Sequence, residues 1–338
     1  MAVRRMILAG AALLASLLPG LVAHAHALDI VPFASRNQSP VVQIFGLPYA
    51  GTGKVLPAGR IEMLLTADMA NDYEVDSNAR EAIVLDGESY RYNLGLRYGI
   101  GDRYDVGLEI PVITYSGGFL DGFIEDWHRF FGMPDGGRPA APRDRLLFSY
   151  VRDGVERLSF NRSGTGLGDI RINGGMQLYH EHEESTIDVA LRGSVKVPTG
   201  DSTRLHGSGS TDVAVWLAAS EHYPTELGEV AGFASVGGMA MTRGRVLSDQ
   251  QRNFAGFGNF GLGWAPADWI AFKVQVDANT PLYSDSALRE LGDGAVQLVV
   301  GGTLGLTGST SLDLGVTEDI AVNTAPDVGF HFGLRQQF

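Results

Sequence analysis

Residues 328–338 read Val-Gly-Phe-His-Phe-Gly-Leu-Arg-Gln-Gln-Phe. Every second residue of this stretch is apolar except Gln336, which is the period of a β-strand with one apolar face. The closing strand of a transmembrane β-barrel needs this pattern, because one row of its side chains must face lipid. The stretch therefore predicts an all-β fold, an antiparallel up-and-down barrel of the outer-membrane type.

The first 27 residues have the features of a secretory signal peptide. Arg4 and Arg5 precede an apolar run from Met6 to Val22, and Ala25-His26-Ala27 has the small-x-small form of a signal-peptidase site. We expect cleavage after Ala27, which leaves 24 basic and 39 acidic residues and a net charge of −15. Such acidity argues against nucleic acid as a partner. The chain has no cysteine, so we expect neither disulfides nor thiol chemistry.

The same pattern recurs along the chain. Runs of about ten residues with period two, separated by turn residues, predict twelve strands. They lie near 59–71, 82–99, 104–115, 167–179, 186–198, 211–220, 229–241, 253–264, 269–279, 295–305, 311–319 and 328–338.

Within the clearly alternating cores of these runs, ionisable residues occupy only one face, and the opposite face carries none. Nine acids and seven bases share the charged face: Glu62, Asp68, Arg91, Arg97, Asp105, Glu109, Asp169, Arg171, Asp188, Arg192, Lys196, Asp212, Lys273, Asp277, Asp313 and Arg335. A charge facing lipid near the bilayer midplane costs roughly 2–4 kcal/mol. This exclusion favours the membrane barrel over the rival interpretation, a secreted soluble all-β domain.

An even number of strands places both chain ends on the periplasmic side. Short turns then fall at 99–103, 180–184, 265–268 and 305–310, and longer external connections near 116–166, 199–210, 242–252 and 280–293. Residues 59–338 form the predicted barrel domain. Residues 28–58 read as an irregular segment that either plugs the lumen or lies beneath it. If 145–160 joins the ring as a hairpin, the barrel has fourteen strands.

One external connection contains a predicted amphipathic helix at 119–131. Its apolar face holds Phe119, Phe123, Trp127 and Phe131, together with Leu120, Ile124 and Phe130. Gly132, Met133 and Pro134 end it. We expect this face to pack into the barrel mouth and constrict it rather than lie in the lipid boundary, because the cationic face of membrane-surface helices is missing.

Three motifs carry a resemblance: Asn37-Gln38-Ser39-Pro40, the loop Ser-Gly-Gly-Phe-Leu-Asp-Gly-Phe-Ile-Glu-Asp-Trp-His at 116–128, and Thr324-Ala325-Pro326-Asp327-Val328. In them the chain resembles a domain-of-unknown-function family of Gram-negative outer-membrane barrels, over essentially its whole mature length. The resemblance implies a fold and a compartment but no substrate. Gly166-Leu167-Gly168-Asp169 with Val197-Pro198-Thr199-Gly200-Asp201 more loosely resembles outer-membrane channels found beside aromatic-degradation pathways.

These features together predict export to the outer membrane of a Gram-negative cell, with membrane lipid and lipopolysaccharide around the barrel. Phe338 resembles the C-terminal signal by which the bacterial barrel-assembly machinery recognises its substrates, so we expect that machinery to be a partner.

The sequence gives little support for catalytic or metal chemistry. A lipid hydrolase would need Ser and His close together on an outward strand face, and no strand offers such a pair. Two clusters could reach a metal: Asp121, Glu125 and His128, and separately His180, His182, Glu183 and Glu184. Charged side chains exposed to water in this way are usually only solvated. The glycines of 164–168 open a strand rather than a helix, so they do not form a phosphate loop. We therefore predict no enzyme activity, no cofactor and no metal.

The predicted function is passive passage of a small solute. The expected pore-lining residues are Arg91, Arg97, Asp105, Glu109, Asp169, Arg171, Arg192 and Lys196. If Tyr115 lies near Leu167, Glu109 and Arg192 both fall opposite Asn173, and Lys196 falls opposite Asp169. Facing rows of acids and bases of this kind could orient a polar or zwitterionic solute. The alternative is a closed structural or envelope-maintenance barrel whose charges pair with one another; a lipid hydrolase is a weaker one.

Overall fold

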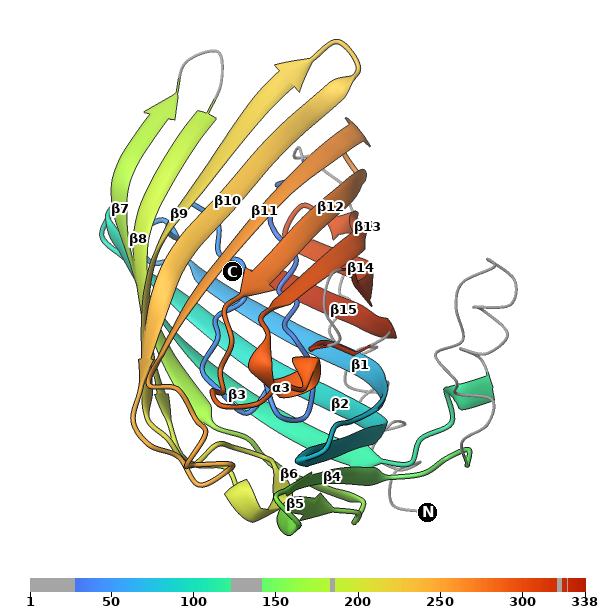
Figure 1. The fold of residues 1–338 in the computed structure, drawn as a ribbon. Helices are drawn as coiled ribbons and strands as arrows, with labels where there is room; N and C mark the ends of the chain where they lie inside the picture. The colour runs from blue at the N-terminus through green and yellow to red at the C-terminus, as the bar shows by residue number, and fades with distance from the viewer. Residues whose placement is uncertain (1–27, 123–141, 183–185, 321–323, 327) are drawn as a thin grey trace.

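The computed structural model describes residues 28–122, 142–182, 186–320, 324–326 and 328–338. In this part of the chain twelve antiparallel strands form a closed ring (Figure 1), as the sequence predicts. They are β1 (Ile61–Ser77), β2 (Glu81–Ile100), β3 (Tyr104–Ser116), β7 (Ile170–His182), β8 (Thr186–Val197), β9 (Asp212–Thr225), β10 (Gly228–Met241), β11 (Phe254–Ala267), β12 (Ile270–Asn279), β13 (Ala295–Thr307), β14 (Thr310–Asp319) and β15 (Val328–Gln337). Pairing of β15 with β1 closes the ring.

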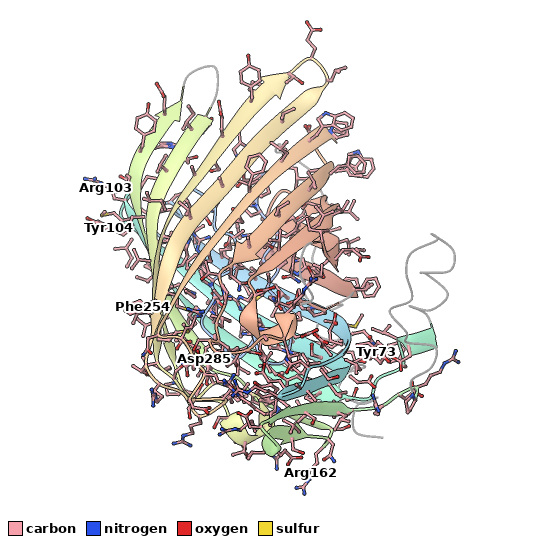
Figure 2. All side chains as sticks on the ribbon, in the orientation of Figure 1. Tyr73, Arg103, Tyr104, Arg162, Phe254 and Asp285 are labelled. Carbon is pink, nitrogen blue, oxygen red and sulfur yellow. The ribbon has the colours of Figure 1, made fainter. Side chains whose placement is uncertain are left out.

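Burial alternates along the strands in the opposite sense to a soluble protein. Along β2 and β3 the outward apolar side chains are exposed, among them Tyr92, Tyr98 and Val106, whereas the charged residues between them are buried. Tyr104 and Phe254 project from the outer surface of the ring (Figure 2). This is the pattern that a lipid-facing exterior and a polar interior require.

The two ends of the ring differ. At one end, here called the turn end, residues 226–227, 268–269 and 308–309 join neighbouring strands, and Ile61 and Phe338 exchange backbone hydrogen bonds of 3.3 and 2.9 Å. At the other, the loop end, long connections carry β4 (Leu147–Arg152), β5 (Val155–Phe160), β6 (Gly164–Leu167), η2 (Ser202–Arg204) and α3 (Arg289–Gly292). The predicted asymmetry of short turns and long loops is present.

The alternative with fourteen strands in the ring is wrong. The β4–β5 hairpin does join the sheet, but β4 pairs only with Glu81–Asp86 of β2. The pairing of β2 with β3 begins two residues later, at Glu88. The hairpin therefore extends the sheet beyond the loop end of the ring.

Two predicted features fall on residues outside the described part of the chain. The signal peptide at 1–27 is one, and most of the loop helix, from Phe123 onward, is the other. Within the described residues, no helix has the length and apolar character needed to cross a membrane.

Candidate functional site: the barrel lumen

Charged side chains line the inner face of the ring, and they include every residue predicted to line a pore. Arg91, Asp105, Glu109, Asp169, Arg171, Arg192 and Lys196 are buried, and Arg97 is largely so. Because an unpaired buried charge is costly, each of these side chains is expected to have an opposite charge nearby.

Most of these charges pair with other charges of the wall. At the turn end, Glu62 accepts from Arg97 at 3.1 Å and from Arg335 at 3.0 Å. Arg97 also binds Asp105, which lies 3.5 Å from Arg192. The result is a chain of alternating charges that runs from β15 to β8.

Two buried lysines form separate pairs elsewhere in the wall. The Lys196 ammonium lies 2.7 Å from Asp169 and 3.0 Å from Asp212. The Lys273 ammonium lies 2.7 Å from Asp313 on a neighbouring part of the ring. Acids and bases are thus interleaved around the lumen.

The predicted facing rows of acids and bases are wrong, because the register differs. Glu109 lies opposite Arg171, and Lys196 also lies opposite Arg171, rather than opposite Asn173 and Asp169. The strand is interrupted between β6 and β7 at residues 168–169, where the Gly168 amide donates to the Pro111 carbonyl. Tyr115 pairs with Gly164 rather than with Leu167, and the interruption then shifts the pairing of β3 by one residue, so that Glu109 lies opposite Arg171 at 3.4 Å.

Residues 28–58 run inside the ring without regular secondary structure (Figure 1). From Ile30 to Gly46 every residue is buried except Arg36. The first limb follows β12 toward the loop end, and alternate residues form three hydrogen bonds of 2.9 Å with it: Val31 with Lys273, Phe33 with Gln275, and Ser35 with Asp277. This period of two shows that the limb is extended alongside the strand.

The second limb returns along β8 and β7. The Gly46 amide donates to Asp212 at 2.7 Å. Arg192 donates to the carbonyls of Thr52 and Lys54 at 2.8 and 2.7 Å. The Val55 amide then donates to Gln177 at 2.8 Å, close to the start of β1. Residues 28–58, called the segment below, therefore form a hairpin with both ends at the turn end and its tip toward the loop end.

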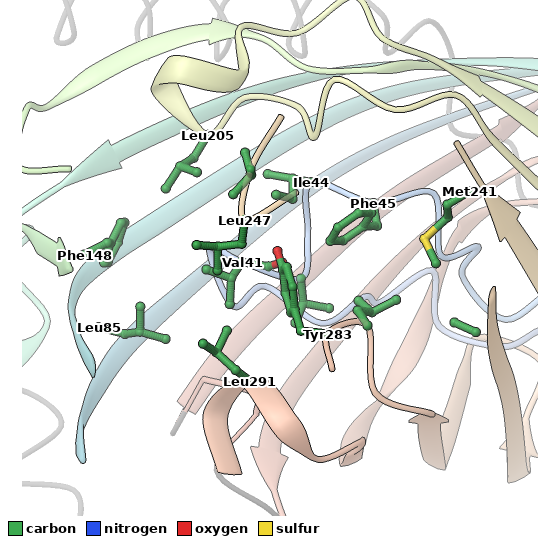
Figure 3. Close-up of a cluster of buried hydrophobic side chains, with 14 of the residues drawn as sticks. Val41, Ile44, Phe45, Leu85, Phe148, Leu205, Met241, Leu247, Tyr283 and Leu291 are labelled. Atoms are coloured by element: carbon green, nitrogen blue, oxygen red, sulfur yellow. The ribbon is translucent and has the colours of Figure 1, made fainter. Parts of the chain in front are cut away.

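The tip is apolar. Val41, Val42, Ile44 and Phe45 pack among buried side chains of the loop end, including Leu205, Leu247, Tyr283 and Leu291 (Figure 3). The Phe45 ring lies edge-on to that of Tyr283, with centroids 5.7 Å apart. Burying four such side chains contributes roughly 1.5–3 kcal/mol each, as an upper range.

Little space remains around the segment. Two cavities beside it hold about 50 and 40 Å³. A single water needs on the order of 10–15 Å³. A larger cavity of about 730 Å³ opens at the turn end, lined by Leu28, Lys54, Arg97, Trp269 and Arg335 among others. The lumen is thus open at the turn end and largely filled where the segment runs through it.

Sequence reasoning missed part of this site. Gln177 and Gln275, which bind the segment, are uncharged and were not among the predicted pore-lining residues. Both share the inward parity of charged neighbours on their strands, so the alternation could have identified them. Lys273 and Asp277 were placed on the charged face but outside the predicted pore set.

The base of the long external loop is anchored to the wall. Glu88 accepts from the amides of Phe119 and Leu120 at 2.8 and 2.5 Å. Leu120 is buried beside Val328, whereas the side chain of Phe119 is 68% exposed. Constriction of the mouth by Phe119, Phe123, Trp127 and Phe131 stays a prediction, since the last three lie outside the described residues.

The fold and its charged interior define an outer-membrane-type β-barrel with a channel-like architecture. A family model described as "Protein of unknown function (DUF3187)" matches residues 12–338, so the chain belongs to this family. This confirms the family resemblance seen in the sequence. Among curated proteins no match was found.

Solved structures of outer-membrane proteins are similar to this chain to different degrees. The COG4313 outer-membrane channel from Pseudomonas putida F1 is 12% identical, with a TM-score of 0.54 over 85% of this chain and 98% of that one. The NanC porin is 7% identical, with a TM-score of 0.43 over 81% and 98% of the two chains. The toluene transporter TbuX from Ralstonia pickettii is 10% identical, with a TM-score of 0.36 over 95% and 98%.

Proposed function

We propose that the chain is an outer-membrane channel for passive passage of a small solute, and that the segment is its gate. In the closed state the segment fills the lumen; passage follows when it withdraws toward the turn end, which faces the periplasm. The pore then exposed is lined by the eight predicted residues, seven on β2, β3, β7 and β8 and Asp169 just before β7.

The observation that carries the proposal is that the wall neutralises most of its own charge. Glu62, Asp105, Asp169 and Asp212 each have a cation of the wall within 3.5 Å. From the charged wall, withdrawal of the segment would remove mainly hydrogen bonds to its backbone, which water can replace. At the loop end it would also remove the apolar packing of the tip. A polar, charge-paired wall of this kind is suited to a water-filled lumen.

The path of the segment supports the same proposal. Both of its ends lie at the turn end, so the hairpin can leave without passing a chain end through the ring. Its irregular backbone shares no strand ladder with the wall. The similar fold of the Pseudomonas putida channel agrees with a conducting role.

A closed structural barrel is the second candidate, and one observation favours it. Beside the segment the cavities of about 50 and 40 Å³ admit a few waters and no solute. If the apolar tip never leaves its cluster, the chain is a plugged envelope protein.

A reversible lock separates the two candidates. A Cβ built on Gly46 lies 2.9 Å from the Cβ of Asp212, so a small shift of the segment gives the spacing of a disulfide, roughly 3.5–4.5 Å. The chain has no native cysteine. We expect Gly46→Cys/Asp212→Cys to be silent in a planar bilayer when oxidised and to conduct after reduction, whereas Gly46→Cys alone should be insensitive to reductant.

Two results would reject the gate. Absence of conductance in the wild type and in both redox states supports the closed barrel. Equal conductance in the oxidised and reduced forms means that the solute path does not require withdrawal of the segment.

The cellular setting forms part of the proposal. A signal peptide at 1–27 exports the chain, the barrel-assembly machinery inserts it through Phe338, and lipid and lipopolysaccharide surround it. We assign it no catalytic activity. Fractionation of untagged protein tests the location, since recovery from the soluble periplasm would refute it.

A further inference from the structure

One buried cation of the lumen has no acid partner. Arg91 is 5% exposed, and no carboxylate of the described residues lies within 4.0 Å of its guanidinium. Asp68 faces it across the β1–β2 ladder, but that carboxylate binds His331 at 2.6 Å. The hydrogen bond of Arg91 goes to the carbonyl of Gln43 in the segment, at 3.3 Å.

The surroundings of Arg91 are cationic. Arg36 of the segment and Arg171 of β7 both bind Glu109, and the charges of both act unfavourably on Arg91. Arg36 and Arg171 thus share one carboxylate, and Arg91 has none within 4.0 Å among the described residues. The Nε atoms of all three are buried without an acceptor among the described residues. The sixteen inward charges nearly balance overall, but this region carries a local excess of positive charge.

Backbone carbonyls of the segment act as acceptors for this excess. Gln43 accepts from Arg91, and Leu47 accepts from Arg171 at 3.0 Å. When the segment withdraws, it takes both carbonyls and Arg36 with it. Glu109 keeps Arg171 and the amide of Asn173, which lies at 2.7 Å. Among the described residues, Arg91 then has no hydrogen-bond acceptor, and the wall carboxylates that act on it from a distance, Asp68 and Glu109, stay bonded to His331 and Arg171.

We propose that Arg91, assisted by Arg171, binds the oxyanion group of the permeating solute, a carboxylate or a phosphate, in place of the Gln43 and Leu47 carbonyls. This inference rests on the proposed function and gives its substrate class. A guanidinium presents a planar fork of donors that matches the two oxygens of a carboxylate or phosphate. Charge-assisted bonds of this type are stronger than those to a neutral carbonyl, so the anion competes with the segment.

The test uses the full chain in detergent and measures hydrogen exchange of the amides of residues 41–47. Acetate and phosphate are the probes, each compared with chloride at the same ionic strength. We expect each effective anion to accelerate exchange at least tenfold in the wild type. An effect of acetate alone assigns a carboxylate, and an effect of phosphate alone assigns a phosphate.

Arg91→Met is the decisive variant. Removing the Arg91 guanidinium leaves no acid unpaired, so the ring should stay folded. Fast gel migration without boiling measures this. We expect exchange in this variant to be independent of the anion. Arg80→Met is the matched control, because Arg80 pairs with Asp153 on the exposed surface of the loop end and its loss changes the net charge equally. Anion-independent exchange in the wild type, or an equal response in Arg91→Met, overturns the proposal.

Conductance separates this proposal from the channel itself. In a planar bilayer, we expect reversal potentials to show preference for acetate or phosphate over sodium, and this preference should fall in Arg91→Met. Anion-dependent exchange without any conductance supports the site and rejects the channel. Conductance with the same selectivity in both proteins rejects the site alone.

Discussion

Replacing Phe45 by alanine should unseat the tip of the segment while the ring stays folded. Phe45 is 3% exposed, and its ring meets Tyr283 edge-on in the loop-end cluster. Truncating a buried phenylalanine to alanine typically costs 3–5 kcal/mol. If the whole loss destabilises the docked segment relative to the withdrawn one, the withdrawn population rises by about a hundredfold to a few thousandfold.

Trypsin measures this population, because cleavage after the segment's Arg36 requires its buried backbone to leave the wall. When withdrawal and return are fast relative to cleavage, the cleavage rate follows the withdrawn fraction. We expect Phe45→Ala to raise that rate by at least a hundredfold at unchanged gel mobility without boiling.

Phe254→Ala is the matched control. It removes the same side chain from the outer face, where Phe254 is 75% exposed. An unchanged cleavage rate at Arg36 in Phe45→Ala would refute the idea that tip packing seats the segment. Loss of the fast-migrating form would instead show that the tip supports the ring itself.

Three further predictions concern the wall and the loop end. Lys196→Met leaves its two carboxylate partners buried without a cation and should destabilise the barrel by about 3–5 kcal/mol, seen as a lower temperature of conversion to the slow gel form. Gly118→Ala should loosen the long external loop, because Gly118 has φ +78° and a Cβ there would lie 1.7 Å from the Glu88 carboxyl carbon; proteolysis of that loop measures the effect. Burial lowers the pKa of the His206 imidazole, so protonation is easier once its loop opens. Stability of residues 199–211 should therefore be full above the ordinary histidine pKa and fall as the pH drops from about 7.5 to about 5, which hydrogen exchange measures.

Each of these predictions has its own control. Lys54→Met removes an exposed lysine of the segment and should leave the conversion temperature nearly unchanged. Gly122→Ala, where a built Cβ meets nothing within 4 Å, should not increase proteolysis of the external loop. His206→Phe keeps a ring beside Tyr115 and should abolish the pH dependence of exchange at 199–211. A slope that persists in His206→Phe would assign it to another group.

The barrel wall could be predicted from sequence because its constraint is local and one-sided. A residue such as Val106 or Asp105 must face lipid or lumen, and lipid excludes charge so strongly that alternation alone assigns the faces. The register across β3 and β7 could not be predicted in the same way. It depends on the pairing of Tyr115 with Gly164 and on a one-residue shift at 168–169, and neither has a distinctive residue pattern.

The seating of the segment was also beyond sequence reasoning, which left open whether it plugs the lumen. Pro32, Pro40, Pro48 and Pro57 mark it as irregular, and an irregular stretch has no periodicity that reveals its partners. Its tip packs against loop residues such as Leu205 and Tyr283, which also stand outside any repeating pattern. Only the three-dimensional arrangement brings these surfaces together.

The hydrogen bond from the Phe33 amide to Gln275 joins residues 242 positions apart, and that from Arg192 to the Thr52 carbonyl joins residues 140 positions apart. Contacts of such sequence separation form late, because the chain between them must be ordered first. The segment comes before every strand in the chain, yet it has no binding surface until β8 and β12 stand in the wall. The segment can therefore dock only after β8 and β12 have formed, so the part of the wall that is built before β12 must be able to hold its shape with water in place of the segment.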